Sequence, residues 1–580
     1  MNNLRDMPTI FFILMRRLRA PLILLIVLYA FSVLGFVLIP GQDDQGNVWH
    51  MSFFHAFYFV SYMGSTIGFG EVPYAFTDAQ RMWTTLTIYA TVIGWLYSIG
   101  SLLAVFQDPL FTKLRREYSF LRQVRGVISP FYLICGYGET GSTLVKALAE
   151  EGIKSIVIDC DETRINELGL AALPRRPLGL VADAASPRVL QGAGVNKSNC
   201  LGVVALTDSD QVNLMVALGV YALNPDLRLL ARVESSEAQE NIRSFGENTV
   251  INPFEAFAER LELALTRPSH YILSEWMNGV PYQRLQEPVF PRKGAWVLAG
   301  FGRFGRAVHR LMMADGIPVR VIDIKQEGLP ERAVTGTGTE AKTLLEAGID
   351  MAVGIIAGTD NDVSNLSILM TAREQNPSLF MVARQNQREN ELIFDRAHFS
   401  MTMKHGDVIA HRIFTLLRTP LISDFINECN QQDKAWVNQL ISRILGVIDQ
   451  EVPYLWEIRI TDKQAPALYQ ACVSKQKPRL EHLLMSPSDR TKTLQAIPLL
   501  LKRSGAIDLI PDPMRELQPN DRLLMCAVPH MSGLMKWATH NEVILKYLLS
   551  GQEVSGGWLW RCLRERKWFF PNANQVARER

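Results

Sequence analysis

Two kinds of glycine-containing segment have the residue types and spacing to bind ions or phosphates through the backbone. The first is Thr66-Ile67-Gly68-Phe69-Gly70, which is followed by Glu71. Glycines at positions 68 and 70 permit left-handed backbone angles, which would turn successive carbonyl oxygens toward the same side. Carbonyls in such a row can replace the water shell of a cation, with Thr66, Ile67, Gly68 and Phe69 as the expected ligands.

The second kind is a Gly-x-Gly-x-x-Gly turn, Gly136–Gly141, between a strand-like apolar run and a helix-like amphipathic run. Here Gly136 would make the tight turn, Gly138 would let amides approach a phosphate, and Gly141 would let the helix pack on the sheet. Asp159 ends the next strand and would accept hydrogen bonds from a ribose, which favours NAD(H) or an adenine nucleotide over NADP. The alternative is a doubly wound domain that keeps the turn for packing and binds nothing.

The pattern recurs at Gly300–Gly305, and Asp323 ends the strand that follows. Later residues also match in pairs, which are Thr207 with Thr359, Asp208 with Asp360, Asn213 with Asn365, and Arg232 with Arg384. The recurrence indicates an internal duplication. Arg303 and Arg306 add positive charge beside the second turn, so a phosphate-bearing ligand is compatible with it. The two sites should nevertheless differ, and one of them could be purely structural.

The elements before these turns read as a membrane module. Pro21–Pro40 contains no charged residue and is long enough to cross a bilayer, whereas a signal peptide would have a shorter apolar region. Met82–Phe106 is also uncharged, and its Thr, Ser, Tyr and Gly content indicates one face against protein or water. Trp49–Gly64 is aromatic-rich but too short to cross, which favours a re-entrant helix. Non-helical backbone after it is tolerated only inside protein or along a water-filled path.

Basic residues flank both predicted spans: Arg16, Arg17 and Arg19 precede the first, and Lys113, Arg115 and Arg116 follow the second. The positive-inside rule therefore places both termini in the cytoplasm and the intervening loop outside. This loop carries Asp43, Asp44, Glu71 and Asp78 against Arg81. Such an acidic balance would raise the cation concentration at an outer mouth.

Composition limits the remaining possibilities. A chain of 580 residues is too long for one hydrophobic core and should form three or four units. With 60 Lys and Arg against 58 Asp and Glu, no overall field favours nucleic acid as a partner. The seven cysteines show no Cys-x-x-Cys pair, so reduced thiols in a cytosolic compartment are expected.

The order of span, short helix, Thr-Ile-Gly-Phe-Gly and span resembles the pore module of two-span potassium channels. The resemblance implies K⁺ as the permeant ion, a homotetramer, and a multi-pass position among the lipids of the plasma membrane. The commonest family form is Thr-Val-Gly-Tyr-Gly-Asp, so this chain departs at Ile67, Phe69 and Glu71. Loss of the tyrosine hydroxyl removes a hydrogen bond that would brace the filter from behind. Gly94 resembles the family's gating hinge, although close helix packing explains a membrane glycine equally well.

The duplicated region resembles TrkA-like regulatory domains, also called RCK domains, in the order and spacing of its elements. The implied fold class is an α-helical membrane pore module joined to two cytosolic α/β Rossmann-like RCK domains and a C-terminal TrkA-C-like lobe. The implied nucleotide contacts of the first domain are Gly136, Tyr137, Gly138, Glu139, Thr140, Gly141, Asp159, Asp183, Thr207 and Asp208. Those of the second are Gly300, Gly302, Arg303, Phe304, Gly305 and Asp323, with Gly338 at the position that resembles Asp183.

The resulting domain map follows the chain. It comprises a cytosolic N-terminus at 1–19, a pore module at 20–106, a linker at 107–127, a first RCK domain at 128–291, a second RCK lobe with crossover helices at 292–448, a TrkA-C-like lobe at 449–535 and a helical tail at 536–580. Within the pore module the spans are expected at 20–40 and 82–106, and the pore helix and filter at 49–71. Pro253–Thr266 and Val408–Arg418 resemble the helices through which such domains pair, although their stripes could equally be ordinary core.

These features together predict a ligand-gated potassium channel subunit, not an enzyme, whose opening is controlled by NAD(H), ADP or ATP bound to a cytosolic ring. One alternative is a membrane-anchored NAD-dependent oxidoreductase, for which no catalytic base or nucleophile is evident. The other is a regulatory subunit of a potassium transporter, for which the filter would be superfluous. Calcium as a further ligand has no support in the sequence, since no EF-hand loop appears.

Overall fold

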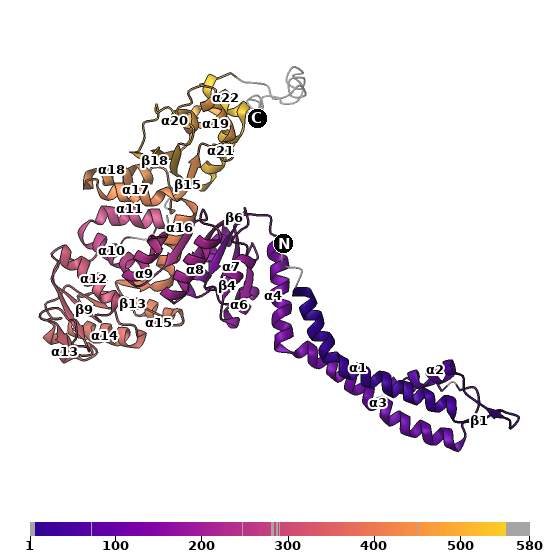
Figure 1. The fold of residues 1–580 in the computed structure, drawn as a ribbon. Helices are drawn as coiled ribbons and strands as arrows, with labels where there is room; N and C mark the ends of the chain where they lie inside the picture. The colour runs from indigo at the N-terminus through magenta and orange to yellow at the C-terminus, as the bar shows by residue number, and fades with distance from the viewer. Residues whose placement is uncertain are drawn as a thin grey trace, which may run out of the picture. The chain divides into compact units, whose positions relative to one another are not determined.

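The computed structural model describes residues 6–70, 72–245, 248–279, 284–285, 288, 290–448 and 451–552. The chain separates into two compact units, Met1–Val127 and Ile128–Arg580, which are described in turn (Figure 1). The predicted tail at 536–580 is described only as far as residue 552, so its last 28 residues lie outside the described residues.

The first unit contains two helices long and apolar enough to cross a membrane, Leu18–Leu38 within the first helix and Asp78–Gln107. Its elements are α1 (Asp6–Leu38), β1 (Gly41–Gln42), β2 (Val48–Trp49), α2 (Phe53–Gly64), α3 (Asp78–Gln107) and α4 (Pro109–Arg125). Helices α1 and α3 pack side by side, and the Trp83 indole donates a hydrogen bond to the Ser32 carbonyl across them at 3.1 Å. The short helix α2 packs on both. Its inward residues Ala56 and Val60 share a core with Phe36 of α1.

Three predicted boundaries in this unit differ from the structure. The first helix begins before residue 20 and continues through Pro21. The short helix begins at Phe53 rather than at residue 49, because Trp49 pairs with Gly41 in a two-stranded ribbon and the Ser52 hydroxyl caps α2 by accepting from the His55 amide at 3.3 Å. The predicted linker at 107–127 is largely helix α4, whose last turn carries Arg122 and Arg125.

The second unit contains two parallel six-stranded sheets with the same strand order. The sheet of the first copy runs β5-β4-β3-β6-β7-β8, and that of the second copy runs β11-β10-β9-β12-β13-β14. The first copy comprises β3 (Phe131–Cys135), α5 (Glu139–Glu150), β4 (Lys154–Asp159), α6 (Glu162–Leu170), β5 (Leu178–Val181), α7 (Pro187–Gly192), β6 (Cys200–Ala205), α8 (Asp210–Leu223), β7 (Leu229–Arg232), α9 (Ser236–Arg243) and β8 (Thr249–Ile251). The second comprises β9 (Trp296–Ala299), α12 (Arg303–Ala314), β10 (Val319–Asp323), β11 (Val334–Thr335), α13 (Ala341–Glu346), β12 (Gly354–Ala357), α14 (Asp362–Gln375), β13 (Phe380–Gln385), η1 (Arg388–Asn390), α15 (Glu391–Arg396) and β14 (Met401–Lys404).

The two copies therefore share one doubly wound fold, as their matching sequences predict. They differ after the second strand, where the first copy forms helix α6 while residues 324–333 of the second copy contain no helix.

Helices that follow each copy cross to the other copy. The first set is α10 (Pro253–Thr266) and α11 (Pro268–Asn278), and the second is α16 (His405–Arg418), α17 (Leu421–Asn430) and α18 (Lys434–Leu445). Helix α10 packs on α12 of the second copy, with Phe257 and Leu261 in one core with Val308 (Figure 1). Helix α16 packs on α5 of the first copy, with Ile413 in one core with Leu144. The exchange buries apolar faces of both helices and joins the copies into one unit.

A C-terminal lobe follows these helices. It is an antiparallel sheet in the order β15-β20-β18-β19 with a small ribbon and four helices. The bounds are β15 (Tyr454–Arg459), α19 (Pro466–Val473), α20 (Leu480–Leu484), β16 (Met485–Ser486), β17 (Asp489–Thr493), β18 (Ala496–Arg503), β19 (Ala506–Leu509), β20 (Arg522–Ala527), α21 (Pro529–His540) and α22 (Glu542–Ser550). The buried Asp521 carboxylate accepts two hydrogen bonds from the Arg503 guanidinium, at 2.8 and 2.7 Å.

Candidate functional sites

The candidate filter has an alternating backbone. Thr66, Gly68 and Gly70 have φ angles of 63°, 66° and 71°, whereas Ile67 and Phe69 between them do not have positive φ. This alternation turns successive carbonyls the same way, as the glycine spacing predicts. A positive φ at the β-branched Thr66 is uncommon and costs backbone energy, which is typical of functional segments.

The candidate filter is held by the last turn of α2. The amides of Ile67 and Gly68 both donate to the Tyr62 carbonyl, at 3.0 and 3.3 Å. The Phe69 ring lies edge-on to the Tyr62 ring with centroids 6.4 Å apart. Phe69 lacks the tyrosine hydroxyl that was expected to donate a bracing hydrogen bond, but its ring makes an aromatic contact with α2. Glu71 lies outside the described residues.

The hinge candidate Gly94 is a contact point between helices. A Cβ at Gly94 would lie 2.5 Å from Cδ1 of Leu28, so α1 and α3 approach closely there. A Cβ at Gly100 would meet nothing within 4 Å. Helix α3 is continuous through both glycines. In this single chain, packing accounts for Gly94, and its role as a hinge stays a prediction.

The first phosphate-type turn requires glycine at two of its three positions. Gly136 has φ +105°, and a Cβ there would lie 2.8 Å from the Leu206 backbone. A Cβ at Gly141 would lie 2.2 Å from the Gly136 carbonyl oxygen. Helix α5 consequently begins at Glu139 in close contact with the turn, with Gly138 as its N-cap. A helix N-terminus can bind a phosphate through its first amides.

An arginine that was not among the predicted site residues lies beside the middle glycine. The Arg164 guanidinium is 3.5 Å from where a Cβ of Gly138 would be, and 3.8 Å from the Asp159 carboxylate. It also approaches Asp161 at 3.6 Å, and its side chain remains 40% exposed. The sequence signal was an arginine in the first turn of the helix that follows Asp159.

Asp159 is buried and holds the turn. One carboxylate oxygen accepts from the Tyr137 amide at 2.5 Å, and the other accepts from the Asp161 amide at 2.8 Å. The accessible carboxylate nearby belongs to Asp161, whose pKa is lowered mainly by hydrogen bonds from the Thr163 hydroxyl and amide. Ribose recognition at this edge would thus involve an Asp159 whose oxygens already accept backbone bonds.

The other predicted residues of the first site lie at the carboxyl ends of neighbouring parallel strands. The Thr207 hydroxyl donates to the Asn213 side chain at 2.7 Å. The exposed Asp208 pairs with Arg232 at 3.3 Å. Asp183 is exposed and accepts from the Ala185 amide at 2.9 Å. Thr140 lies in α5 rather than at a strand end. Its side chain is buried, so only its backbone can face a ligand.

The second turn repeats the backbone of the first. Gly300 has φ +98°, and a Cβ at Gly305 would lie 2.0 Å from the Gly300 carbonyl oxygen. Asp323 accepts from the Phe301 amide at 2.5 Å and from the Lys325 amide at 2.9 Å, as Asp159 does in the first copy. A Cβ at Gly302 would meet nothing within 4 Å. The backbone of the fingerprint is therefore present in both copies.

The side chains that follow Gly302 serve the contact between copies. Phe304 is fully buried against Phe254 and Phe257 of α10, so its ring is not available to a ligand. Arg303 forms an ion pair of 2.8 Å with Glu234 of the first copy. These contacts across the copies were not predictable from the motif.

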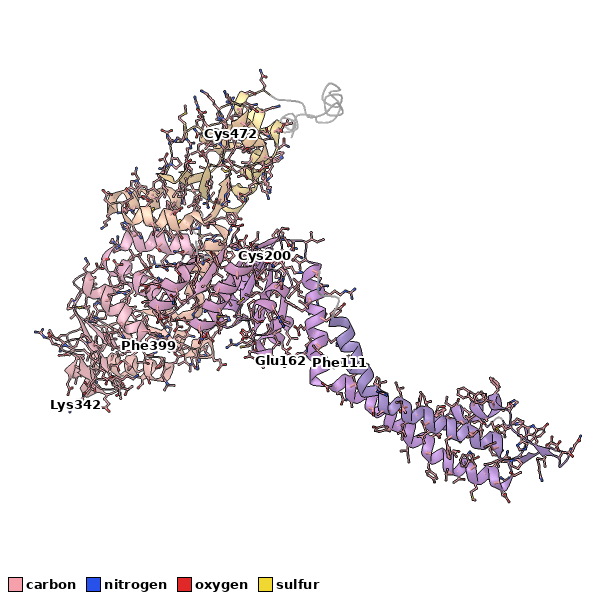
Figure 2. The ribbon with its side chains drawn as sticks, viewed as in Figure 1. Phe111, Glu162, Cys200, Lys342, Phe399 and Cys472 are labelled. Carbon is pink, nitrogen blue, oxygen red and sulfur yellow. The ribbon has the colours of Figure 1, made fainter. Side chains whose placement is uncertain are left out.

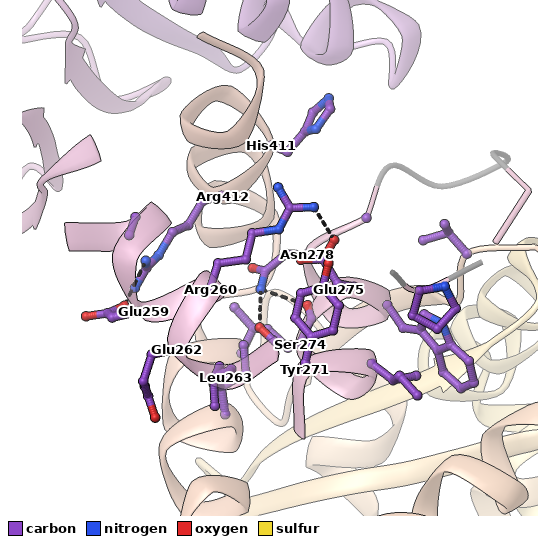
Figure 3. A pocket seen from close by; sticks show the side chains of 18 of the residues that line it. Glu259, Arg260, Glu262, Leu263, Tyr271, Ser274, Glu275, Asn278, His411 and Arg412 are labelled. Carbon is purple, nitrogen blue, oxygen red and sulfur yellow. Dashed lines mark hydrogen bonds and ion pairs between the residues drawn. The ribbon is translucent and has the colours of Figure 1, made fainter. Parts of the chain in front are cut away.

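A cavity of about 990 Å³ lies away from both turns, where α10 and α11 face α16 and α17. Figure 3 shows the Arg260 guanidinium bound to Glu275 at 2.6 Å, and Arg412 paired with Glu259. Burial raises the pKa of Tyr271, which lines the same cavity. The acidic groups of this cavity are therefore matched by arginines from both sets of crossing helices.

The six cysteines within the described residues give no sign of a disulfide or metal site. Burial raises the pKa of Cys135 to about 12 and that of Cys200 to about 11. Cys200 lies in the first copy and Cys472 in the C-terminal lobe (Figure 2). Cys160, directly after Asp159, is exposed. Across the described ranges, no three His, Cys, Asp or Glu side chains are placed to hold a metal ion.

Comparison with known families agrees with this division of the chain. The ion channel family model matches residues 23–108, and the TrkA-N domain model matches residues 132–253 and 296–404. The chain therefore combines an ion-channel domain with two TrkA-N matches that follow it.

Similar proteins include two named as potassium channels. The chain is 27% identical over 205 residues to Potassium channel protein 1 of Methanocaldococcus jannaschii, and the match covers 35% of this chain and 59% of that protein. It is 29% identical over 249 residues to Probable potassium channel protein 2 of the same organism, with coverage of 42% and 67%. The match thus spans about three fifths to two thirds of these relatives. A solved structure described as the GsuK channel bound to NAD is 16% identical, with a TM-score of 0.45, over 94% of this chain and all of that one.

Proposed function

We propose that this chain is one subunit of a homotetrameric potassium-selective channel in a cell membrane, gated by a nucleotide bound to its first TrkA-N domain. The observation that carries the proposal is the alternating φ at Thr66, Gly68 and Gly70, between two helices of membrane-crossing length. An alternating backbone presents a ladder of carbonyls, and four ladders around one axis would match the hydration shell of K⁺.

Exposure of the filter side chains supports assembly around such an axis. Ile67 and Phe69 are 63% and 71% exposed in the single chain. Large apolar side chains at a strained backbone need neighbours to hold them, and adjacent subunits would supply these contacts. The basic residues flanking the spans favour both termini and the TrkA-N domains on the cytoplasmic side.

The first turn is the favoured nucleotide site. Its middle glycine is open to a phosphate, with Arg164 beside it, and Asp159 and Asp161 lie next to the expected ribose position. NAD(H), ADP and ATP each offer a phosphate for the helix N-terminus and an unphosphorylated 2′-hydroxyl for the carboxylates. At the second turn, Arg303 is already paired with Glu234.

Nucleotide binding could move the gate without a single strong switch. Shifting a gate from 1:99 to 99:1 takes about 5.5 kcal/mol of differential binding. Divided among four equivalent sites, this is about 1.4 kcal/mol each, within the roughly 1 to 3 kcal/mol typical of allosteric coupling.

The test is ion flux from purified protein in liposomes. Wild-type chain should conduct K⁺ far better than Na⁺, and Gly68→Ala should abolish this selectivity because alanine resists a φ of 66°. Gly46→Ala is the matched control, since Gly46 also has a positive φ of 84° with open space around it but lies outside the filter. Equal selectivity in wild type and Gly68→Ala would refute the filter assignment.

The same preparation separates the alternatives. A transporter's regulatory subunit would bind nucleotide but conduct nothing on its own. An oxidoreductase would consume NADH in the absence of an ion gradient. No candidate base stands out for that reaction: His309 of α12 packs on the Phe301 ring with centroids 5.4 Å apart, and burial lowers its pKa.

A further inference from the structure

The two copies meet through two pseudo-equivalent contact points. At one, the ring of Phe254 at the start of α10 lies 5.7 Å from the Arg303 guanidinium. At the other, Gly406 at the start of α16 faces Glu139. Each contact joins the start of a crossing helix to the first residue of the helix after a glycine turn. The two points therefore correspond, with the roles of the copies exchanged.

Backbone hydrogen bonds fix a second correspondence. The Glu234 amide donates to the Asp210 carboxylate at 2.9 Å, and the Asn386 amide donates to the Asp362 carboxylate at 2.6 Å. Each of the two residues stands two positions after the arginine of its copy's fifth strand, which is Arg232 in β7 and Arg384 in β13. Glu234 of the first copy is thus equivalent to Asn386 of the second.

The two points carry different charges. The Glu234 carboxylate is 14% exposed and lies between Arg232 of its own copy, at 2.6 Å, and Arg303 of the second copy, at 2.8 Å. It also acts electrostatically on Arg384. At the equivalent point the second copy offers the neutral Asn386, and the first copy offers Glu139 where the second has Arg303.

Pairing of like copies would lose this match. Two first copies would bring Glu234 toward Glu139, so carboxylates would face each other. They would also place Phe254 where Gly406 now lies, although even a Cβ at Gly406 would be 2.5 Å from Cγ of Glu139. Two second copies would face Arg303 with Asn386, which leaves Arg303 and Arg384 without the Glu234 carboxylate.

We propose that Glu234, Arg303, Glu139 and Gly406 specify pairing of a first copy with a second copy and exclude pairing of two first copies. Charge and shape act together here, because an unlike pair gains an ion pair and a like pair gains both a repulsion and a steric overlap. The proposal goes beyond the channel function and does not depend on any ligand. It assigns Glu139 and Arg303, which were candidate nucleotide contacts, to recognition between domains.

The charge arm of the test is a double-mutant cycle in the full-length protein, read as the midpoint of thermal unfolding of the cytosolic unit. Arg303→Gln should lower the midpoint by roughly 5 °C, because it leaves Glu234 among fewer cations. In a Glu234→Gln background the same change should have little further effect. Arg306→Gln is the matched control on the same helix, since exposed Arg306 contacts the Phe301 carbonyl of its own copy.

A second set of variants tests the steric fit between Gly406 and Glu139 and does not involve the charge of Arg303. Gly406→Ala should lower the midpoint, and Glu139→Ala should relieve that loss when the two are combined. Gly533→Ala in α21 serves as the control, because a Cβ there meets nothing within 4 Å. The proposal is overturned if Arg303→Gln costs the same with and without Glu234, or if Glu139→Ala fails to relieve Gly406→Ala.

Discussion

The first and second glycine turns share a backbone but differ in the side chain that begins the helix. Both have a positive φ at their first glycine, and in both a Cβ at the helix glycine would lie about 2 Å from the carbonyl oxygen of that first glycine. Both are held by a strand-ending aspartate that accepts two backbone amides. Glu139 stands at the first turn, however, and Arg303 at the second. Packing therefore explains the backbone geometry that the two turns share, and the side chains determine what each turn contacts.

The surroundings of the middle glycine sharpen this contrast. Arg164 of α6 reaches toward Gly138, whereas residues 324–333 of the second copy form no corresponding helix and a Cβ at Gly302 would meet nothing within 4 Å. The first turn thus has a cation for a phosphate and nearby carboxylates for a ribose. At the second turn, the nearby cation Arg303 forms an ion pair with Glu234 of the first copy instead.

The largest effect is expected where the copies are alike. Gly141→Ala and Gly305→Ala should each destabilise the second unit by about 3 kcal/mol, because the new Cβ would overlap the carbonyl of the turn's first glycine. Gly302→Ala is the control, with open space and an ordinary φ of −70°. Unfolding midpoints of the full-length variants would check this. Similar midpoints for all three would mean that neither turn needs its third glycine.

Nucleotide binding should separate the copies. Gly138→Val should weaken NAD or ADP binding at least about 10-fold, a loss of about 1.4 kcal/mol or more, by filling the approach to the helix N-terminus. Gly302→Val should leave the same affinity nearly unchanged. Calorimetric titration of the detergent-solubilised chain would measure both. If Gly302→Val weakened binding as much as Gly138→Val, the second turn would be a nucleotide site of equal standing.

Much of this comparison was accessible from sequence because it depends on local pattern. The strand-like apolar run before Gly136 is β3, Phe131–Cys135. In both copies the first glycine follows a strand and the strand-ending aspartate accepts from the turn, as the spacing predicts. The internal match of Thr207 with Thr359 also reappears as matching hydrogen bonds to Asn213 and Asn365. Local sequence determines such features, since turn, strand and helix lie within one short segment.

What could not be predicted depends on contacts between distant segments. Nothing near Glu234 in the sequence indicates Arg303 as its partner, and Phe304 reads as a fingerprint residue although its ring fills a core with α10. Residues 107–127 were predicted to be a linker because the segment is rich in charged residues, whereas the structure forms the amphipathic helix α4 there. Trp49 was assigned to the short helix on composition, whereas strand pairing with Gly41 moves the helix start to Phe53.

A smaller effect is expected from the turn-holding aspartates. Asp159→Asn and Asp323→Asn should each cost roughly 1 to 2 kcal/mol of stability, since one carboxylate oxygen is replaced by an amide that cannot accept from a backbone N–H. Only Asp159→Asn should also weaken nucleotide binding. Unfolding midpoints and titrations on the same samples would check the two effects separately. Equal loss of binding in both variants would contradict the assignment of the ligand to the first turn.

The smallest effect is expected on the rate of modification of a cysteine that occurs in only one copy. Cys160 is exposed directly after Asp159, and Ile324 occupies the corresponding position after Asp323. In a Cys562→Ser background, maleimide should modify Cys160 fastest, because Cys135 is buried and its pKa is raised to about 12, which leaves little reactive thiolate near neutral pH. A nucleotide on the first turn should slow modification of Cys160 a few-fold by covering the adjacent ribose edge. If saturating NAD and ADP left the rate unchanged while titration showed binding, the ligand would lie elsewhere, and the contrast between the two turns would have to be drawn from packing alone.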